Sequence, residues 1–166
     1  MKLLSSIIYA IVLLFSSTGC SSYPHQSWLE DRSLDKIADD RATEIVTALE
    51  NGDQVAIRSM FSKQALNEAE ELDDNILSAI EYYKGNLVLS NGTLATEESQ
   101  NGKRKTFIIR ADYTISTDLE TYNLYFIEKY NSEDENENGL YLIWISKDSE
   151  KDKYEGDYGA GIYFPS

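Results

Sequence analysis

The sequence of 166 residues has few of the residues that build covalent or catalytic sites. It contains one cysteine, Cys20, so one chain can form neither an internal disulfide nor a cysteine-based metal centre. Its one histidine, His25, falls in a polar stretch near the N-terminus, where fixed geometry for acid–base work is not expected. Hydrolysis by a histidine-containing triad is therefore not expected. No cofactor motif is found.

The N-terminal hydrophobic run is too short to cross a membrane. It covers residues 3–15 and is interrupted by Ser5 and Ser6, whereas a spanning helix needs about 20 apolar residues. It follows Lys2 and precedes four small residues, which is the order typical of a secretory signal. Residues 1–19 are therefore predicted to be a signal peptide.

Cys20 stands directly after this segment. The residues Ser17-Thr18-Gly19-Cys20 resemble a bacterial lipoprotein signal, with Ser17 where such signals usually have Leu. The resemblance implies a lipid such as palmitate on Cys20 and attachment to the extracytoplasmic face of the cell membrane. The alternative is an ordinary cleaved signal with an incidental cysteine. Residues 20–32 are polar, contain Pro24 and are predicted to be a tether to a single domain of residues 33–166.

Charge of one sign dominates the chain. It has 29 acidic and 15 basic residues, which gives a formal net charge of −14. This balance argues against nucleic acid or an anionic membrane surface as a direct partner. It favours solubility, attraction of cations or a basic protein partner.

The first half of the domain has helical patterns. Apolar residues recur every three or four positions from Ser33 to Glu50, which predicts an amphipathic helix. Arg41 falls within its apolar face, and the favoured interpretation is that its stem packs while its guanidinium reaches solvent. The alternative is a buried cation that meets a carboxylate from a sheet or a ligand. Three short helices follow, and their predicted N-caps are Asp53, Ser62 and Asp73, with Val55, Ala56, Met60 and Phe61 expected to be buried in the first of them.

The second half has strand patterns, and the predicted fold is α+β, with helices on one face of an antiparallel sheet. Apolar and polar residues alternate over 105–116, a second strand is predicted over 121–130, and residues 140–147 are apolar on both faces, which is typical of a covered central strand. Residues 86–90 predict a short first strand before a hairpin turn at Asn91-Gly92, 97–102 a loop, and 154–164 an irregular closing strand.

Several of these segments resemble an uncharacterised family of Gram-positive lipoproteins, a domain of unknown function similar to the nuclear transport factor 2-like superfamily. The resemblance rests on Cys20 and on the segments 48–53, 60–66, 82–85, 117–122 and 161–163. It implies a cone in which helices pack on the concave side of a curved sheet, with a pocket between them. Fold alone does not fix function, since this superfamily includes enzymes, ligand binders and inert scaffolds.

The pocket that the resemblance implies would be lined by aromatic and charged residues. If it binds a ligand, the candidate residues are Arg41, Asp112, Tyr113, Tyr122, Tyr125, Glu128 and Trp144. An isomerase or dehydratase would use Asp112 or Glu128 as base and a tyrosine such as Tyr113 as hydrogen-bond donor. Strands favour aromatic residues for packing alone, which is the simpler explanation of the tyrosines.

One acidic loop resembles half of a calcium-binding motif. Residues 134–139, Asp-Glu-Asn-Glu-Asn-Gly, match the opening of an EF-hand loop, which makes Asp134, Asn136 and Asn138 weak metal candidates. Ile145 occupies the twelfth position, where such loops need a bidentate glutamate. A solvated hairpin loop is the favoured interpretation.

The sequence thus favours a membrane-anchored, extracytoplasmic and non-enzymatic module that binds a small ligand or a protein of the cell envelope. Two alternatives stay open. The first is an enzyme of the isomerase or dehydratase type in the cone. The second is an acidic immunity-type protein that inhibits a basic partner.

Overall fold

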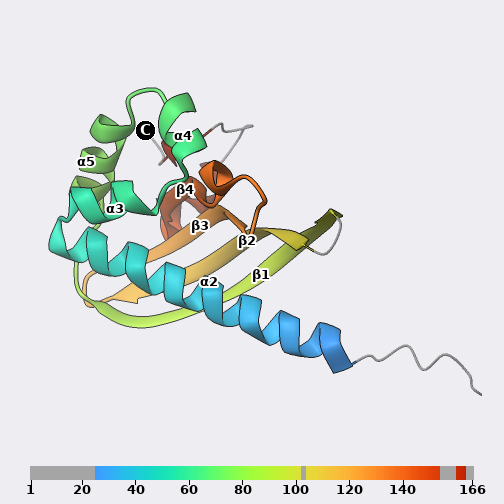
Figure 1. The fold of residues 1–166 in the computed structure, drawn as a ribbon. Helices are drawn as coiled ribbons and strands as arrows, with labels where there is room; N and C mark the ends of the chain where they lie inside the picture. The colour runs from blue at the N-terminus through green and yellow to red at the C-terminus, as the bar shows by residue number, and fades with distance from the viewer. Residues whose placement is uncertain (1–24, 102–103, 154–159, 164–166) are drawn as a thin grey trace, which may run out of the picture. The chain divides into compact units, whose positions relative to one another are not determined.

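The computed structural model describes residues 25–101, 104–153 and 160–163 (Figure 1). The predicted signal peptide, Cys20 and the first part of the predicted tether lie outside the described residues. Contacts divide the chain into residues 1–32 and 33–166, and the second unit contains the domain described below. Among the described residues, no helix combines the length and the apolar character needed to cross a membrane.

Within residues 25–101, four α-helices precede the sheet. The first is longer than expected, because it begins at His25 rather than near Ser33, so that residues 25–32 are helical rather than an irregular tether. No glycine or proline interrupts the sequence from residue 25 to residue 51, and Pro24 directly precedes the helix, as proline often does at a helix start. The helices are α2 (His25–Asn51), α3 (Gln54–Met60), α4 (Lys63–Glu68) and α5 (Leu72–Tyr82).

Two of the three predicted helix caps are confirmed. Asp53 accepts a hydrogen bond from the backbone N–H of Ala56 at 2.9 Å, and Ser62 accepts one from Ala65 at 3.0 Å. The prediction that Asp73 caps the last helix is wrong: α5 begins at Leu72, and the cap position is taken two residues earlier by Glu71, whose φ of 55° places it in the left-handed region. The burial predicted for α3 is wrong for Val55, which is 77% exposed, since Ile57 is the buried residue of this short helix.

The sheet has five strands in the order β1-β2-β3-β4-β5 and confirms the α+β class. The first four pair antiparallel with their neighbours, whereas β5 pairs parallel with β4. β4 is buried on both faces, as the sequence predicted for the strand at 140–147. The strands are β1 (Leu87–Asn101), β2 (Arg104–Thr117), β3 (Thr121–Tyr130), β4 (Gly139–Lys147) and β5 (Gly161–Tyr163), with 3₁₀ turns at Glu135–Glu137 and Asp148–Lys153.

The predicted hairpin turn at Asn91-Gly92 is wrong, as is the loop predicted at 97–102 in its described part, residues 97–101. β1 runs without a turn from Leu87 to Asn101 and pairs with β2 along its whole length. The glycine has a different purpose: a Cβ atom at Gly92 would lie 2.4 Å from the ring of Tyr113 on the neighbouring strand. Gly92 therefore lets the Tyr113 ring lie across β1, and an Asn-Gly pair that is typical of turns stays extended.

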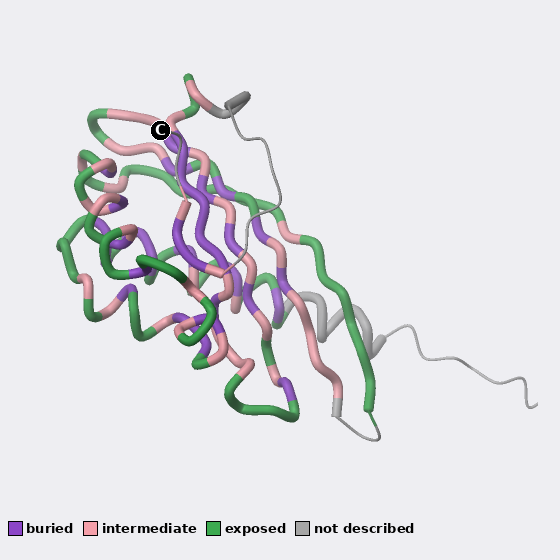
Figure 2. Tube along the Cα trace, turned by 90° about the horizontal axis from the view of Figure 1, so that it is seen from above, coloured by how far each residue is buried: buried purple, intermediate pink, exposed green. Residues whose placement is uncertain are grey.

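The core lies between the sheet and residues 33–82. Figure 2 shows the buried residues gathered along β2, β3 and β4 and on the helix sides that face them, while β1 is exposed along most of its length. Close-packed apolar side chains from both layers fill this space. They include Ala38, Ala42, Ile45, Leu49, Ile57 and Ile76 of the helices and Ile109, Ala111, Ile115, Leu124, Phe126, Leu140, Ile143 and Ile145 of the strands.

Candidate functional site

The seven residues predicted to line a pocket lie on both faces of the sheet and do not share one cavity. Neighbouring residues of a strand point to opposite faces, so Tyr113 is buried on the face that α2 covers and Asp112 is exposed on the other. The helix-covered face also holds Tyr122 and Glu128, and Arg41 reaches it from α2. Asp112, Tyr125 and Trp144 form one cross-strand row on the opposite face.

Arg41 and Glu128 form the main charged contact between α2 and the sheet. The guanidinium donates from Nη2 to Oε1 of Glu128 at 2.7 Å and from Nε to Oε2 at 3.0 Å, which is a bidentate pair. Glu128 is 3% exposed. The expectation that the Arg41 guanidinium reaches solvent is therefore wrong. The less favoured interpretation, a cation that meets a carboxylate of the sheet, is the observed one.

The surroundings of Arg41 keep it charged. Burial acts to lower its pKa, but the hydrogen bonds and charge of Glu128, and then those of Glu44, outweigh burial and leave the pKa above its usual value. Glu44 lies one helical turn from Arg41, with 2.5 Å between its Oε2 and Nη1. Two carboxylates thus hold the guanidinium, and both oxygens of Glu128 are engaged by it.

Tyr113 is also engaged by a helix residue. Its hydroxyl donates to Oδ1 of Asp39 in α2 at 2.6 Å, and its ring stacks on Phe126 with 6.1 Å between ring centroids. Burial and then the contact with Asp39 raise the pKa of Tyr113. The phenol therefore keeps its proton at neutral pH and serves as a donor between helix and sheet.

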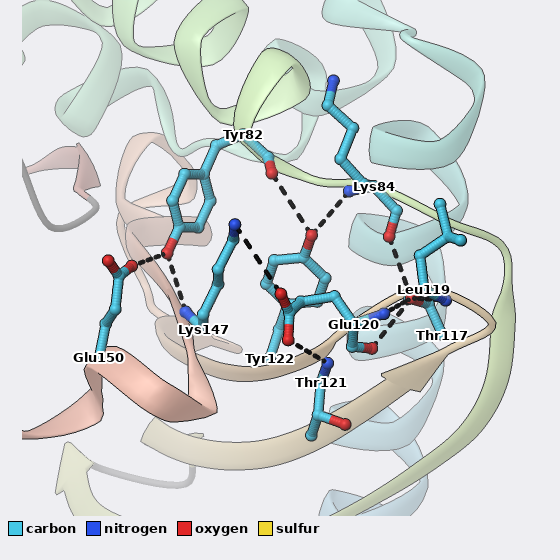
Figure 3. Close-up of polar contacts among 9 residues, drawn as sticks. All are labelled: Tyr82, Lys84, Thr117, Leu119, Glu120, Thr121, Tyr122, Lys147 and Glu150. Carbon is cyan, nitrogen blue, oxygen red and sulfur yellow. Dashed lines mark hydrogen bonds and ion pairs between the residues drawn. The ribbon is translucent and has the colours of Figure 1, made fainter.

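A third group of contacts joins the end of α5 to the β2–β3 hairpin (Figure 3). The Tyr122 hydroxyl accepts a hydrogen bond from the backbone N–H of Lys84 at 2.8 Å and lies 3.4 Å from the carbonyl oxygen of Tyr82. Tyr82 donates to Glu150 at 2.6 Å and accepts from the backbone N–H of Lys147 at 2.9 Å. Tyr83 stacks on Tyr122 with 4.9 Å between centroids.

The hairpin turn completes this joint. The Thr117 hydroxyl lies 3.0 Å from the Lys84 carbonyl oxygen and accepts from the backbone N–H of Glu120 at 2.9 Å. Asp118 accepts from the backbone N–H of Asn86 at 2.7 Å, and the two hydrogen bonds from Asn86 lower the pKa of Asp118. Gly85, with φ of 91°, passes so close that a Cβ atom would lie 2.5 Å from the Thr117 hydroxyl oxygen.

The segments that meet in this joint, 82–85 and 117–122, are among those on which the family resemblance rests. A family model described as a domain of unknown function, DUF5104, matches residues 44–148. The chain belongs to this family. Comparison with curated proteins gives no match. The matched range contains α3 to β4 and most of the helix-covered core.

The open face of the DUF5104 domain carries a hollow of about 370 Å³. Its basic residues are already paired: Arg110 contacts Glu97 at 2.7 Å, and Lys129 contacts Glu137 at 3.1 Å and lies 5.3 Å from the centre of the Tyr141 ring. The hollow is open to solvent and combines apolar and charged groups. It is lined by Glu68, Ile108, Arg110, Ile127, Lys129, Tyr141, Leu142 and Ala160.

None of the residues that line this hollow was among the predicted site residues. The alternation over 105–116 predicts that Arg110 faces away from the core, and residues 140–147 are predicted to be apolar on both faces. Alternation within one strand does not show which outward positions of adjacent strands lie side by side. Ile127 of β3 pairs with Arg110 of β2 and with Leu142 of β4, and this register depends on contacts that the sequence pattern does not specify.

The residues of the calcium-like loop bond to the loop itself. Oδ1 of Asp134 accepts from the backbone N–H of Asn136 at 2.9 Å, and Asn138 accepts from the backbone N–H of Ser132 at 2.7 Å. Within the residues that the structure describes, no cluster of three or more acidic, histidine or cysteine side chains could hold a metal ion. The structure therefore adds no support to the calcium hypothesis.

Two tyrosines of the joint allow a matched test of its stability. Tyr122→Phe removes the acceptor of the Lys84 N–H and is expected to lower the free energy of unfolding by about 1 kcal/mol. The Tyr83 hydroxyl is buried and has no hydrogen-bond partner among the described residues, so Tyr83→Phe is expected to be neutral or stabilising. Urea unfolding of both variants measures the difference, and equal losses would contradict this account of the joint.

The Arg41–Glu128 pair calls for a double-mutant cycle. Arg41→Met leaves the buried Glu128 carboxylate without its partner and is expected to lower the free energy of unfolding by about 3 kcal/mol. Combining Arg41→Met with Glu128→Leu removes both charges and is expected to restore most of that loss. Chemical unfolding of the single and double variants at neutral pH measures these free energies. Strictly additive losses of unfolding free energy would show that the pair is not coupled.

Proposed function

We propose that this DUF5104 chain is a lipid-anchored, extracytoplasmic and non-enzymatic module that binds a protein of the cell envelope. Its binding surface is the face of the sheet opposite α2. The observation that supports this proposal is the difference between the two faces. Close-packed side chains fill the helix-covered face, and the other face carries an open hollow.

The helix-covered face offers little to a substrate. Both carboxylate oxygens of Glu128 accept hydrogen bonds from Arg41, and the Tyr113 hydroxyl donates its hydrogen bond to Asp39. The alternative pairing of Asp112 as base with Tyr113 as donor requires both to face one substrate, but they point to opposite faces of β2. These positions favour a structural purpose for the charged and aromatic residues that an enzyme would use.

The open face has the composition of a protein-binding surface. Arginine and tyrosine are enriched at protein interfaces, and Arg110, Tyr125 and Tyr141 lie beside apolar groups such as Ile127. A small ligand is usually enclosed over most of its surface. A hollow that opens on one face of a sheet suits a side chain of a larger partner better than a small molecule.

The anchor is supported by the sequence. A signal-like segment ends at the only cysteine of the chain, and a lipid on Cys20 would hold the domain at the membrane that its partner shares. We also infer a distant relation to the nuclear transport factor 2-like superfamily, since helices on one face of a mainly antiparallel sheet are the arrangement that this likeness implies.

The anchor is tested with the full-length chain in the bacterium that naturally makes it. Cys20→Ser is expected to remove lipid attachment, seen as loss of incorporated labelled palmitate, and to move the chain out of the membrane fraction. Thr43→Ser, an exposed change on α2, serves as the control and is expected to stay labelled and membrane-bound. Unchanged labelling and fractionation of Cys20→Ser would contradict the proposed lipid anchor.

The binding face is tested by site-specific photocrosslinking in the same cells. A photoreactive amino acid at Ile127 is expected to give a defined adduct with one envelope protein, and the same group at Val55 on α3 is expected to give none. Arg110→Glu should abolish the Ile127 adduct. Equal adducts from both positions, or none from Ile127, would contradict the proposed face. Loss of the adduct at high salt would identify a basic partner.

A further inference from the structure

β1 is an edge strand of unusual length and exposure. It has 15 residues, against about five or six in an average strand, and all but two of them are exposed. β2 pairs with one side of it, and within the described residues no strand pairs with the other. The backbone groups on the free side form a ladder that can accept a further strand.

This edge lacks the usual protection against pairing. Natural edge strands carry charges, prolines or bulges, but residues 87–96 contain no charge and no proline, in a chain where 27% of residues are charged. A single bulge lies at the start, between Leu87 and Leu89. The first charges are Glu97 and Glu98, and both are paired with cations of β2, Arg110 at 2.7 Å and Lys105 at 3.1 Å.

We propose that this edge pairs with β1 of a second copy of the chain, antiparallel and about a two-fold axis. Charge selects the occupant. A basic partner strand would be selected by acidic residues on the edge, and residues 87–96 have none. A partner strand without charge is compatible with the uncharged segment of β1, and β1 of a second copy is such a strand and has the same length. A two-fold axis also closes the assembly at two copies.

Symmetry keeps like charges apart in this arrangement. In a continuous sheet, paired residues have their side chains on the same face, so one residue must pair with its own copy across the axis. We place this residue near the middle of the neutral segment, at Gly92, Thr93 or Leu94. An axis at these positions places Glu97 opposite Leu87, Leu89 or Asn91 of the other copy. None of these registers brings two carboxylates together across the new pair.

The edge also carries apolar surface that a second strand would shield. Val88 is 69% exposed and Leu89 is 61% exposed, and both precede the neutral centre of β1. Two chains with net charge −14 repel each other at long range, and salt screens this repulsion. Pairing of two copies therefore strengthens as ionic strength rises, whereas binding of a basic strand would weaken.

Cysteine crosslinking of the full-length chain in its native membranes tests this pairing. Paired residues of antiparallel strands have Cα atoms about 4.5–5.5 Å apart, within disulfide range. The exposed residues Asn91, Thr93 and Ala95 are changed to cysteine one at a time, and the single variants are also co-expressed in pairs. Mild oxidation is expected to give a disulfide-linked dimer in the combinations that one two-fold register allows.

Thr114→Cys is the matched control, because Thr114 is exposed on the same sheet but on β2, one strand away from the edge. It is expected to give no dimer, as is the parent chain with Cys20 alone. The dimer yield from the edge cysteines should rise with salt. Dimers from Thr114→Cys in equal yield, dimers from no edge combination, or an edge adduct with a different protein would each overturn the pairing of two copies.

Discussion

The rest of the domain depends on the contacts that hold the segment after α5 against the β2–β3 hairpin. Here the helical half becomes the sheet, and the backbone N–H groups that follow the last helical residue need acceptors outside the helix. Tyr122 satisfies the N–H of Lys84 and Asp118 that of Asn86, so the β2–β3 hairpin receives the chain as it leaves the helix. This contact sets Leu87 opposite Thr117 and with it the register of β1.

The parts of the fold that depend on local pattern were predictable. β2 and β3 follow from strict alternation, β4 from its apolar faces, and two helix starts from Asp53 and Ser62, because each signal involves residues near one another in sequence. Gly92 is a position at which the local pattern gives the wrong prediction. Its Asn-Gly pair favours a turn, but the ring of Tyr113 on another strand decides its conformation, and no local pattern contains that ring.

The candidate site was less predictable for the same reason. Alternation in β2 is sufficient to place Asp112 and Tyr113 on opposite faces, so a pocket containing both could have been rejected from the sequence. The pairing of Arg41 with Glu128 could not have been predicted, because 87 residues separate them. The pattern of α2 alone allows Arg41 to face solvent, a ligand or a carboxylate. The hollow at Arg110 and Ile127 likewise depends on strand register.

The parallel pairing of β5 bears on the order in which the chain assembles. Strands β1 to β4 follow one another in the sheet as in the sequence, so each can pair with a neighbour after a short loop closure. β5 must first return to the starting end of β4, and α2 must bring Arg41 to β3. The topology thus favours a central meander of β1 to β4 that forms early, with α2 and β5 docking on it last.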